Sequence, residues 1–282
     1  MLDRIYTTLF LVTGSFLLFL FYNPFLLATA FTLISLVAYY EWLSVSKVKS
    51  KIKYICILSM LVIMYLLVTN TTYNLVQGVN LVSLIIWMLI TIDLFNNFNL
   101  TKKILSKFSI IFGFIIILAT WYLLISFNEV SNTAVIQHSE FLLFNSDFDS
   151  NNIHYYIFII LLVSLVDIFA LLIGKYFGIN ALCPDISPKK TTEGLIGGIA
   201  ATLAVIYVIN IYYFNIDFLF IDIIFFIICC LYCTIGDLFI SIFKRFNNVK
   251  DTGNILPGHG GVLDRIDSYL PVIAIMQFWL IL

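Results

Sequence analysis

Residues 153–174 read IHYYIFIILLVSLVDIFALLIG, an apolar run in which Asp167 is the single Asp, Glu, Lys or Arg. An α-helix rises about 1.5 Å per residue, so this run is long enough to cross a hydrocarbon core of roughly 30 Å. In a water-soluble globule the same segment would have to be buried on every side. The run therefore predicts a transmembrane helix.

The composition extends this prediction to the whole chain. Of the 282 residues, 62% are apolar and 11% are charged, whereas an ordinary soluble domain has roughly 25% charged residues. A globule of this size cannot hide so much apolar surface from water. The net charge of −1 provides no positive field to attract a polyanion such as nucleic acid. We exclude a soluble enzyme, a disordered chain and a nucleic-acid-binding domain, and expect an all-α, polytopic membrane helix bundle.

Nine stretches are long and apolar enough to be membrane spans, and the breaks between them are polar, lysine-rich or contain proline. Residues 5–22, followed by Ala28-Thr29-Ala30, also resemble a signal peptide with its cleavage site. Because a second apolar run continues through Ala30 to Val45, we interpret 5–22 as a span. The predicted spans are 5–22, 24–45, 53–70, 78–95, 108–127, 153–174, 194–214, 217–240 and 269–282.

The basic residues give this bundle an orientation. If the N-terminus with Arg4 is cytoplasmic and the spans alternate, all 15 Lys and Arg residues fall on the cytoplasmic side. Cytoplasmic loops of membrane proteins carry an excess of Lys and Arg. We therefore predict a cytoplasmic N-terminus and an external loop at 128–152.

Charge is concentrated between Asp237 and Asp267, a segment of 31 residues with eight charged side chains. A loop can be charged for solubility alone, but this one contains the glycine-rich turn Pro257–Gly261, which can offer backbone N–H groups to a phosphate. Asp264 and Asp267 follow at a spacing that places both carboxylates on one helix face. Two carboxylates beside such a loop suggest Mg²⁺ completed by substrate phosphates.

A second polar patch, SPKKTTEGLIGG, covers residues 187–198. Ser187 or Thr191 could cap the helix that follows, and Lys189 and Lys190 lie just before it, an arrangement that suits an anion. The alternative is a capped helix whose interfacial lysines contact anionic lipid.

Acidic residues within spans usually face a partner or a water-filled cavity. Asp167 and Asp237 lie toward the cytoplasmic ends of their spans, so we expect them to line one cavity that opens to the cytoplasm. Glu41 and Asp93 also lie at cytoplasmic ends, and we interpret them as interfacial carboxylates. Asp222 lies toward the external end of its span.

The five cysteines predict packing rather than chemistry. Cys230 and Cys233 have CxxC spacing, but they lie mid-span among Ile, Leu and Phe with no His nearby. We interpret them as small buried apolar residues.

The segment from Ser241 to Ser268 closely resembles the signature of the phosphatidate cytidylyltransferases, also called CDP-diacylglycerol synthases. That signature reads S-x-x-K-R, four residues, K-D, and then P-G-H-G-G-x-x-D-R-x-D-S. Every fixed position is matched here, by Ser241, Lys244, Arg245, Lys250, Asp251, Pro257, Gly258, His259, Gly260, Gly261, Asp264, Arg265, Asp267 and Ser268.

The resemblance extends upstream to SPKKTTEG at 187–194, to a D-x-x-A-x-x-x-G-x-x-x-G stretch that begins at Asp167, and more loosely to Glu41-Trp42. Many members of the family have Tyr where this chain has Leu171, so no role carries over to that side chain.

The resemblance implies the reaction CTP + phosphatidate → CDP-diacylglycerol + pyrophosphate, with Mg²⁺ required, on the cytoplasmic face of a bacterial inner membrane. It implies cation binding by Asp237 and Asp264, with Asp267 as a neighbour. Basic residues expected to neutralise the phosphates of CTP or the lipid are Lys190, Lys244, Arg245, Lys250 and Arg265. Other residues expected at the site are Asp167, Ser187, Thr191, Ser241, Asp251, His259, Gly260 and Gly261.

We therefore expect one membrane-embedded domain over 1–282, with N-terminal spans in 1–127 and a catalytic core in 153–282. Its site forms around 175–194 and 237–268, its partners include membrane lipids, and a homodimer is compatible with the sequence. Two alternatives remain: an ion- or proton-coupled transporter that uses Asp167 and Asp222 as a relay, and a CTP-dependent lipid kinase.

Overall fold

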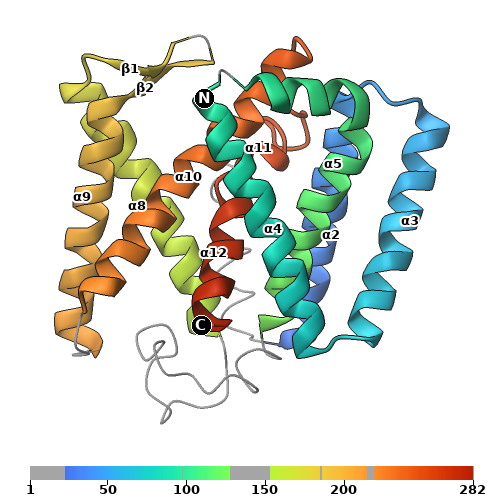
Figure 1. Ribbon diagram of the computed structural model, residues 1–282, viewed down its shortest axis with the longest axis horizontal. Helices are drawn as coiled ribbons and strands as arrows, with labels where there is room; N and C mark the ends of the chain where they lie inside the picture. The colour runs from blue at the N-terminus through green and yellow to red at the C-terminus, as the bar shows by residue number, and fades with distance from the viewer. Residues whose placement is uncertain (1–22, 97, 128–152, 185, 215–218, 282) are drawn as a thin grey trace.

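The chain folds into a bundle of antiparallel helices, seen in a computed structural model that describes residues 23–96, 98–127, 153–184, 186–214 and 219–281 (Figure 1). The predicted span 5–22 and the predicted external loop 128–152 lie outside these residues. The elements are α2 (Pro24–Val45), α3 (Ser50–Thr69), α4 (Tyr73–Leu94), α5 (Asn99–Ile125), α8 (Ile153–Phe177), β1 (Ala181–Cys183), β2 (Ser187–Thr191), α9 (Thr192–Ile209), the π-helical turn η1 (Asn210–Phe214), α10 (Phe220–Phe246), α11 (Leu263–Ile266) and α12 (Tyr269–Ile281).

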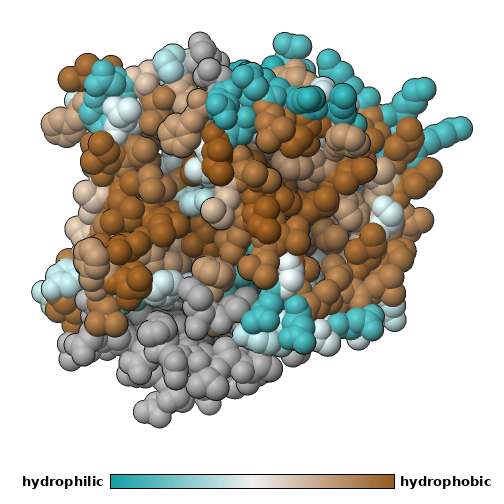
Figure 2. All heavy atoms as spheres, in the orientation of Figure 1, coloured by the Kyte–Doolittle hydropathy of each residue, from teal (hydrophilic) through white to brown (hydrophobic). Residues whose placement is uncertain are grey.

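Among the described residues, seven helices are long and apolar enough to cross a membrane, and α12 is a shorter apolar helix. On the face seen in Figure 2, apolar residues fill the middle of the molecule and hydrophilic residues gather along its upper edge. The prediction of a polytopic helical membrane protein is confirmed. Each predicted span within the described residues corresponds to one of these eight helices.

The helices alternate in direction, so α2, α4, α8 and α10 end at the same face at which α3, α5, α9 and α12 begin (Figure 1). Every Lys and Arg lies near these ends, except Arg4, which is outside the described residues. The β1–β2 hairpin and α11 lie at this face as well. We call it the basic face.

Helix α5 shows how a span can be shorter than the helix that contains it. The helix begins at Asn99, but the backbone is kinked at Phe108, with φ −128° and ψ 23°, where the predicted span starts. Its first turns carry Lys102, Lys103 and Lys107 and run along the basic face before the helix turns into the bundle (Figure 1). The predicted start of the span at residue 108 therefore coincides with the kink in α5, and the helix itself begins nine residues earlier, at Asn99.

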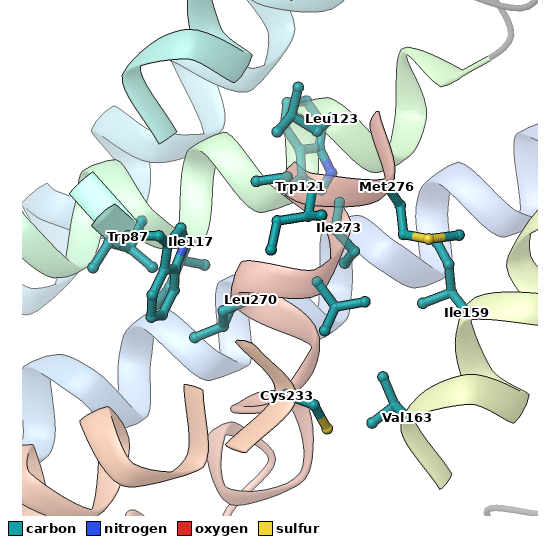
Figure 3. Packing of buried hydrophobic residues seen from close by; sticks show 14 of the residues in the cluster. Trp87, Ile117, Trp121, Leu123, Ile159, Val163, Cys233, Leu270, Ile273 and Met276 are labelled. Atoms are coloured by element: carbon teal, nitrogen blue, oxygen red, sulfur yellow. The ribbon is translucent and has the colours of Figure 1, made fainter. Parts of the chain in front are cut away.

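The core is built around α12, which contacts α4, α5, α8 and α10. Figure 3 shows Leu270, Ile273 and Met276 of this helix packed among side chains from its neighbours. Cys229, Cys230 and Cys233 of α10 belong to the same buried cluster, as predicted for small apolar residues.

Asp93 is buried and holds the α4–α5 connection, so its interpretation as an interfacial carboxylate is wrong. Its side chain is 4% exposed, and its two oxygens accept hydrogen bonds from the backbone N–H groups of Leu100 (3.1 Å) and Thr101 (2.6 Å). An acidic side chain at the start of a helix satisfies donors that have no intrahelical partner. Asp93 caps α5.

Candidate active site

A cavity of about 900 Å³ lies at the basic face, where α8 and α10 end and α9 and α11 begin. Both segments predicted to form the site, 175–194 and 237–268, contribute side chains to its walls. The predicted site residues that line it are Asp167, Ser187, Lys190, Thr191, Asp237, Lys244, Asp251, His259, Asp264, Arg265 and Asp267.

Close helix packing brings these segments together. Gly236 lies where α10 crosses the start of α12, and a Cβ at this position would collide with the backbone oxygen of Asp267 and lie 2.9 Å from Pro271 Cδ. Gly174 and Gly194 play the same part between α8 and α9, because a Cβ at Gly194 would lie 2.7 Å from the backbone oxygen of Ala170 and 3.0 Å from the Cα of Gly174. Only residues without a side chain permit this approach, which places Asp237 beside Asp267.

The β1–β2 hairpin was not predicted, since strands of three and five residues are too short to show a period in the sequence. Its strands pair antiparallel, with Ala181 opposite Thr191 and Cys183 opposite Ser187. Thr191 ends β2 and caps α9, as predicted, by accepting a hydrogen bond from the Gly194 N–H at 3.1 Å. Ser187, the alternative cap, lies instead at the start of β2. The hairpin places Lys190 at the cavity.

Lys190 forms an ion pair with Asp237 of α10. Their side chains are 27% and 29% exposed, so the pair faces the cavity rather than the core. The Ser241 hydroxyl donates to the other Asp237 oxygen at 3.2 Å, which fixes the rotamer of this carboxylate from one turn further along α10. Asp167 lies nearby on α8 and accepts a hydrogen bond from the Cys233 thiol at 3.9 Å.

Asp267 completes this group of carboxylates and is 8% exposed. Burial raises the pKa of Asp267 well above its ordinary value, and the Asp237 and Asp167 carboxylates raise it further; the Ser268 N–H and the Lys190 ammonium only partly oppose this. Three carboxylates therefore gather around the Lys190 ammonium. Their oxygens are the type of ligand that a hard cation such as Mg²⁺ takes.

Asp264 belongs to a second group, beside the first. Its Oδ1 accepts from Lys244 Nζ at 2.6 Å, and its Oδ2 accepts from the backbone N–H groups of Thr252 (2.8 Å) and Gly261 (3.0 Å). Burial alone would raise the pKa of Asp264, but the Lys244 ammonium and these N–H groups outweigh it, so the pKa is lowered. Asp264 is an ionised carboxylate that ties α10 to the glycine-rich turn.

The glycine-rich turn forms its own cavity of about 580 Å³, which shares Asp251, His259 and Arg265 with the larger one and also includes Lys250 and Gly260. Gly258 and Gly260 adopt φ of 77° and 88°, which residues with a side chain rarely do. The Arg265 guanidinium donates to the His259 carbonyl at 2.9 Å and so braces the turn. A concave, cationic surface results.

Two predicted residues have other surroundings. The Gly261 N–H donates to Asp264, so in this structure it points into the loop rather than toward a phosphate. Arg245 is exposed in the last turn of α10 and lines neither of these two cavities. Leu171, where the family often has Tyr, is 67% exposed and lines the larger cavity.

Glu41 lies against the loop that follows the glycine-rich turn, outside both cavities, and its interpretation as an interfacial carboxylate is wrong. It is 2% exposed, and its oxygens accept hydrogen bonds from the backbone N–H groups of Val262 (3.0 Å) and Leu263 (2.8 Å). These residues are more than 200 positions away in the chain, so local sequence could not reveal the contact. The one available signal was the loose match of Glu41-Trp42 to the family.

The donor set suits Mg²⁺. Among the described residues, no group of three or more His, Cys, Asp or Glu side chains is arranged to hold a metal ion by itself. Mg²⁺ does not require one, because it is usually bound by one or two carboxylates, with water and substrate phosphates completing its shell. Asp237 and Asp267 are candidates for that role because they lie beside each other on the cavity wall. Asp237 is paired with Lys190 and Ser241, and Asp264 with Lys244 and the loop, so a cation at either residue would share the carboxylate with a lysine.

Comparison with known proteins matches the whole chain to one family. The sequence profile of the "Cytidylyltransferase family" matches residues 2–282. A Staphylococcus saprophyticus protein named phosphatidate cytidylyltransferase is 44% identical over 133 residues, which are 47% of this chain and 51% of that protein. A protein of the same name from Rickettsia bellii is 50% identical over 124 residues, 40% of this chain and 52% of the relative. The chain spans about half the length of the curated relatives it matches.

Proposed function

The chain belongs to the cytidylyltransferase family, and from this premise we propose that it is a phosphatidate cytidylyltransferase. It would convert CTP and phosphatidate into CDP-diacylglycerol and pyrophosphate. The observation that carries the proposal is the cavity at the basic face, where two polar segments distant in sequence meet between apolar helices. A cavity in this position can be reached by a lipid head group from the membrane and by a nucleotide from the aqueous phase, and the reaction requires both substrates.

The walls of the larger cavity suit an amphipathic substrate. Leu171, Leu182 and Leu195 line it together with Lys189 and Lys190. An acyl glycerol would contact the leucines, and its phosphate would lie among the lysines. The smaller cavity is polar and cationic, which suits the phosphates of a nucleoside triphosphate.

The reaction requires little covalent chemistry from the protein. A phosphate oxygen of phosphatidate forms a bond to the α-phosphorus of CTP, and the bond from that phosphorus to the pyrophosphate oxygen breaks. The nucleophile is already an anion, so the mechanism needs no general base. The rate enhancement then comes from alignment of the two substrates and from neutralisation of their charges.

Lys190 and Lys244 are the residues best placed to neutralise these charges. Each pairs with a carboxylate, Lys190 with Asp237 and Lys244 with Asp264. Each ammonium has three N–H donors, so a phosphate can be bound while the carboxylate still holds the lysine in position. Lys250 and Arg265 contribute positive charge from the glycine-rich turn.

Mg²⁺, held by Asp237 and Asp267, would supply charge stabilisation to the phosphates in the transition state. Asp264 would be a third ligand; Lys244 holds it as Lys190 holds Asp237, so in both cases the cation and a lysine would share the carboxylate. Asp167 adds negative charge to the same wall, which favours a cation over a second anion there.

We place the basic face on the cytoplasmic side of a bacterial inner membrane. The distribution of Lys and Arg supports this orientation, and CTP is a cytoplasmic metabolite. A transporter relay would need carboxylates near the middle of the membrane, whereas Asp222 lies in the first turn of α10 and accepts a hydrogen bond from the Leu219 N–H at 2.9 Å, so the structure offers this alternative less support.

Purified full-length protein in liposomes tests the proposal. We expect CDP-diacylglycerol to form only when phosphatidate, CTP and Mg²⁺ are all present, with one pyrophosphate released for each lipid product. No lipid product under these conditions, from protein that remains folded, would contradict the proposal.

A further inference from the structure

We propose that Glu41, far from the signature in sequence, is a positioning residue for the reaction: it holds the loop from Thr252 to Leu263 in its active conformation. The kinetic consequence rests on the proposed function, whereas the effect on the loop does not. Glu41 lines neither of the two cavities described above, so it acts through other residues.

The Glu41 carboxylate satisfies donors that the loop leaves unpaired. Its Oε1 accepts from the Val262 N–H at 3.0 Å, and its Oε2 accepts from the Leu263 N–H at 2.8 Å. Leu263 is the first residue of α11, so these are N–H groups for which a helix start has no internal acceptor. Because Glu41 is 2% exposed, water does not replace it.

The loop is shaped around this carboxylate. A Cβ at Gly253 would lie 2.5 Å from Glu41 Oε1, and the next nearest atoms are the Cδ and Cγ of the same side chain. A Cβ at Gly261 would also lie 2.5 Å from Glu41 Oε2. At Gly253 the three nearest atoms all belong to Glu41, whereas at Gly261 the Thr252 Oγ1 would be nearer still to such a Cβ. Glu41 therefore fills the space that a side chain at residue 253 would occupy, and shares that role with Thr252 at residue 261.

Trp42 fixes the place of Glu41 on α2. Its ring stacks on Phe243 of α10 at 3.8 Å between centroids, and its Nε1–H donates to the Ser109 carbonyl of α5 at 2.9 Å. Gly113 of α5 leaves room for the ring, because a Cβ there would overlap it. The preceding residue, Glu41, is thereby held at a fixed position relative to the end of α10 and the loop that follows.

Thr252 connects Glu41 to the proposed catalytic residues. Its Oγ1 lies 3.2 Å from Glu41 Oε2 and 2.9 Å from Asp264 Oδ2, and its single hydroxyl hydrogen can be donated to one of them at a time. When the hydroxyl donates to Glu41, the backbone N–H of Thr252 still donates to Asp264. Asp264 in turn holds Lys244. The path from Glu41 to Lys244 therefore consists of three consecutive hydrogen-bonded contacts, and Glu41 resembles the outer-shell partners that orient the ligands of a functional site.

The test compares E41Q with wild-type protein and with D93N, a matched control. Glutamine has the same shape, but it keeps one acceptor oxygen and turns an NH₂ group toward the loop N–H groups. Asp93 is similarly buried and also accepts from two backbone N–H groups, those of Leu100 and Thr101, but on a different connection. A purely structural role would affect both variants alike.

We expect E41Q to lower kcat by about 10- to 100-fold, the usual effect of losing an outer-shell partner, with KM for phosphatidate within about twofold of wild type. Hydrogen exchange of residues 252–263 in the full-length protein should be faster by about 10-fold or more. D93N should leave kcat within about twofold and loosen only the start of α5. Unchanged kcat and unchanged exchange in E41Q would overturn the proposal.

A pair of variants tests the contact even if E41Q folds poorly. G253A should lower the melting temperature of otherwise wild-type protein, but it should have little effect in an E41A background, where the colliding side chain is gone. An equal effect in both backgrounds would refute the contact. If wild-type protein forms no CDP-lipid, the proposed function fails, whereas the exchange and melting results still decide the role of Glu41 in the loop.

Discussion

Asp237 and Asp222 lie on the same helix, α10, and provide a test in which one carboxylate serves as the control for the other. They are 15 residues apart, which corresponds to about 22 Å of helix rise. Asp237 lines the cavity and pairs with Lys190, whereas Asp222 lies in the first turn and accepts a hydrogen bond from the Leu219 N–H. Replacement of each by Asn keeps the shape and removes the charge.

The expected effects on stability and turnover differ in size. The side chains of Asp237 and Lys190 are each more than a quarter exposed, so solvent screens their ion pair. D237N should therefore lower the free energy of unfolding by at most about 1 kcal/mol. Loss of an outer-shell partner of a metal typically costs 10–100-fold, so loss of a direct ligand should reduce turnover by at least about 100-fold. D222N keeps an acceptor oxygen for Leu219, so it should cost about 1 kcal/mol or less and leave turnover within about twofold.

The assay is the initial rate of CDP-lipid formation by the purified variants, with each rate divided by the amount of folded protein from a melting curve. A D237N rate above about a tenth of wild type would refute the role of Asp237 in charge stabilisation. Equal losses in D237N and D222N would also refute it, since a general weakening of α10 would then explain both.

Other parts of the structure support three more predictions. G260A should lower activity because Gly260 has φ of 88° and a Cβ there would lie 2.9 Å from Asp264 Oδ2, whereas G78A, with no atom within 4 Å, should retain full activity; equal activity of the two variants would contradict this. EDTA should abolish turnover and added Mg²⁺ should restore it, because carboxylates line the cavity proposed to bind a polyanionic substrate; full turnover in EDTA by protein that retains no metal would argue against the assignment. A cysteine introduced at Ser131, with the native cysteines replaced, should react with an impermeant thiol reagent added outside intact cells; reaction only after the membrane is opened would reverse the topology.

Much of the fold could be predicted because a membrane span is recorded in consecutive residues. The run 153–174 predicts α8 without knowledge of its neighbours, and the described residues form a helix over the whole of that run. Where a helix continues beyond the apolar core, composition cannot mark its end. Lys244 and Arg245 belong to the last turn of α10, which ends six residues past the predicted end of the span at 240.

The site was predictable where its residues are close in sequence and not where the fold brings them together. The spacing of Asp264 and Asp267 indicated a shared site, and both line one cavity. The pairing of Lys190 with Asp237 depends on the β1–β2 hairpin, which the sequence does not indicate. Glu41 was misinterpreted because its partners are backbone N–H groups, and these leave no trace in residue types.

The fate of each phosphorus atom of CTP tests the proposed reaction most directly. Full-length protein in phosphatidate liposomes is supplied with CTP labelled either at the α-phosphorus or at the γ-phosphorus. We predict that the α-label enters the lipid and the γ-label is released as pyrophosphate, in equal amounts. Transfer of the γ-label to the lipid would identify a lipid kinase, and absence of both labels from the lipid would exclude either transferase; each of these results would contradict cytidylyl transfer to phosphatidate.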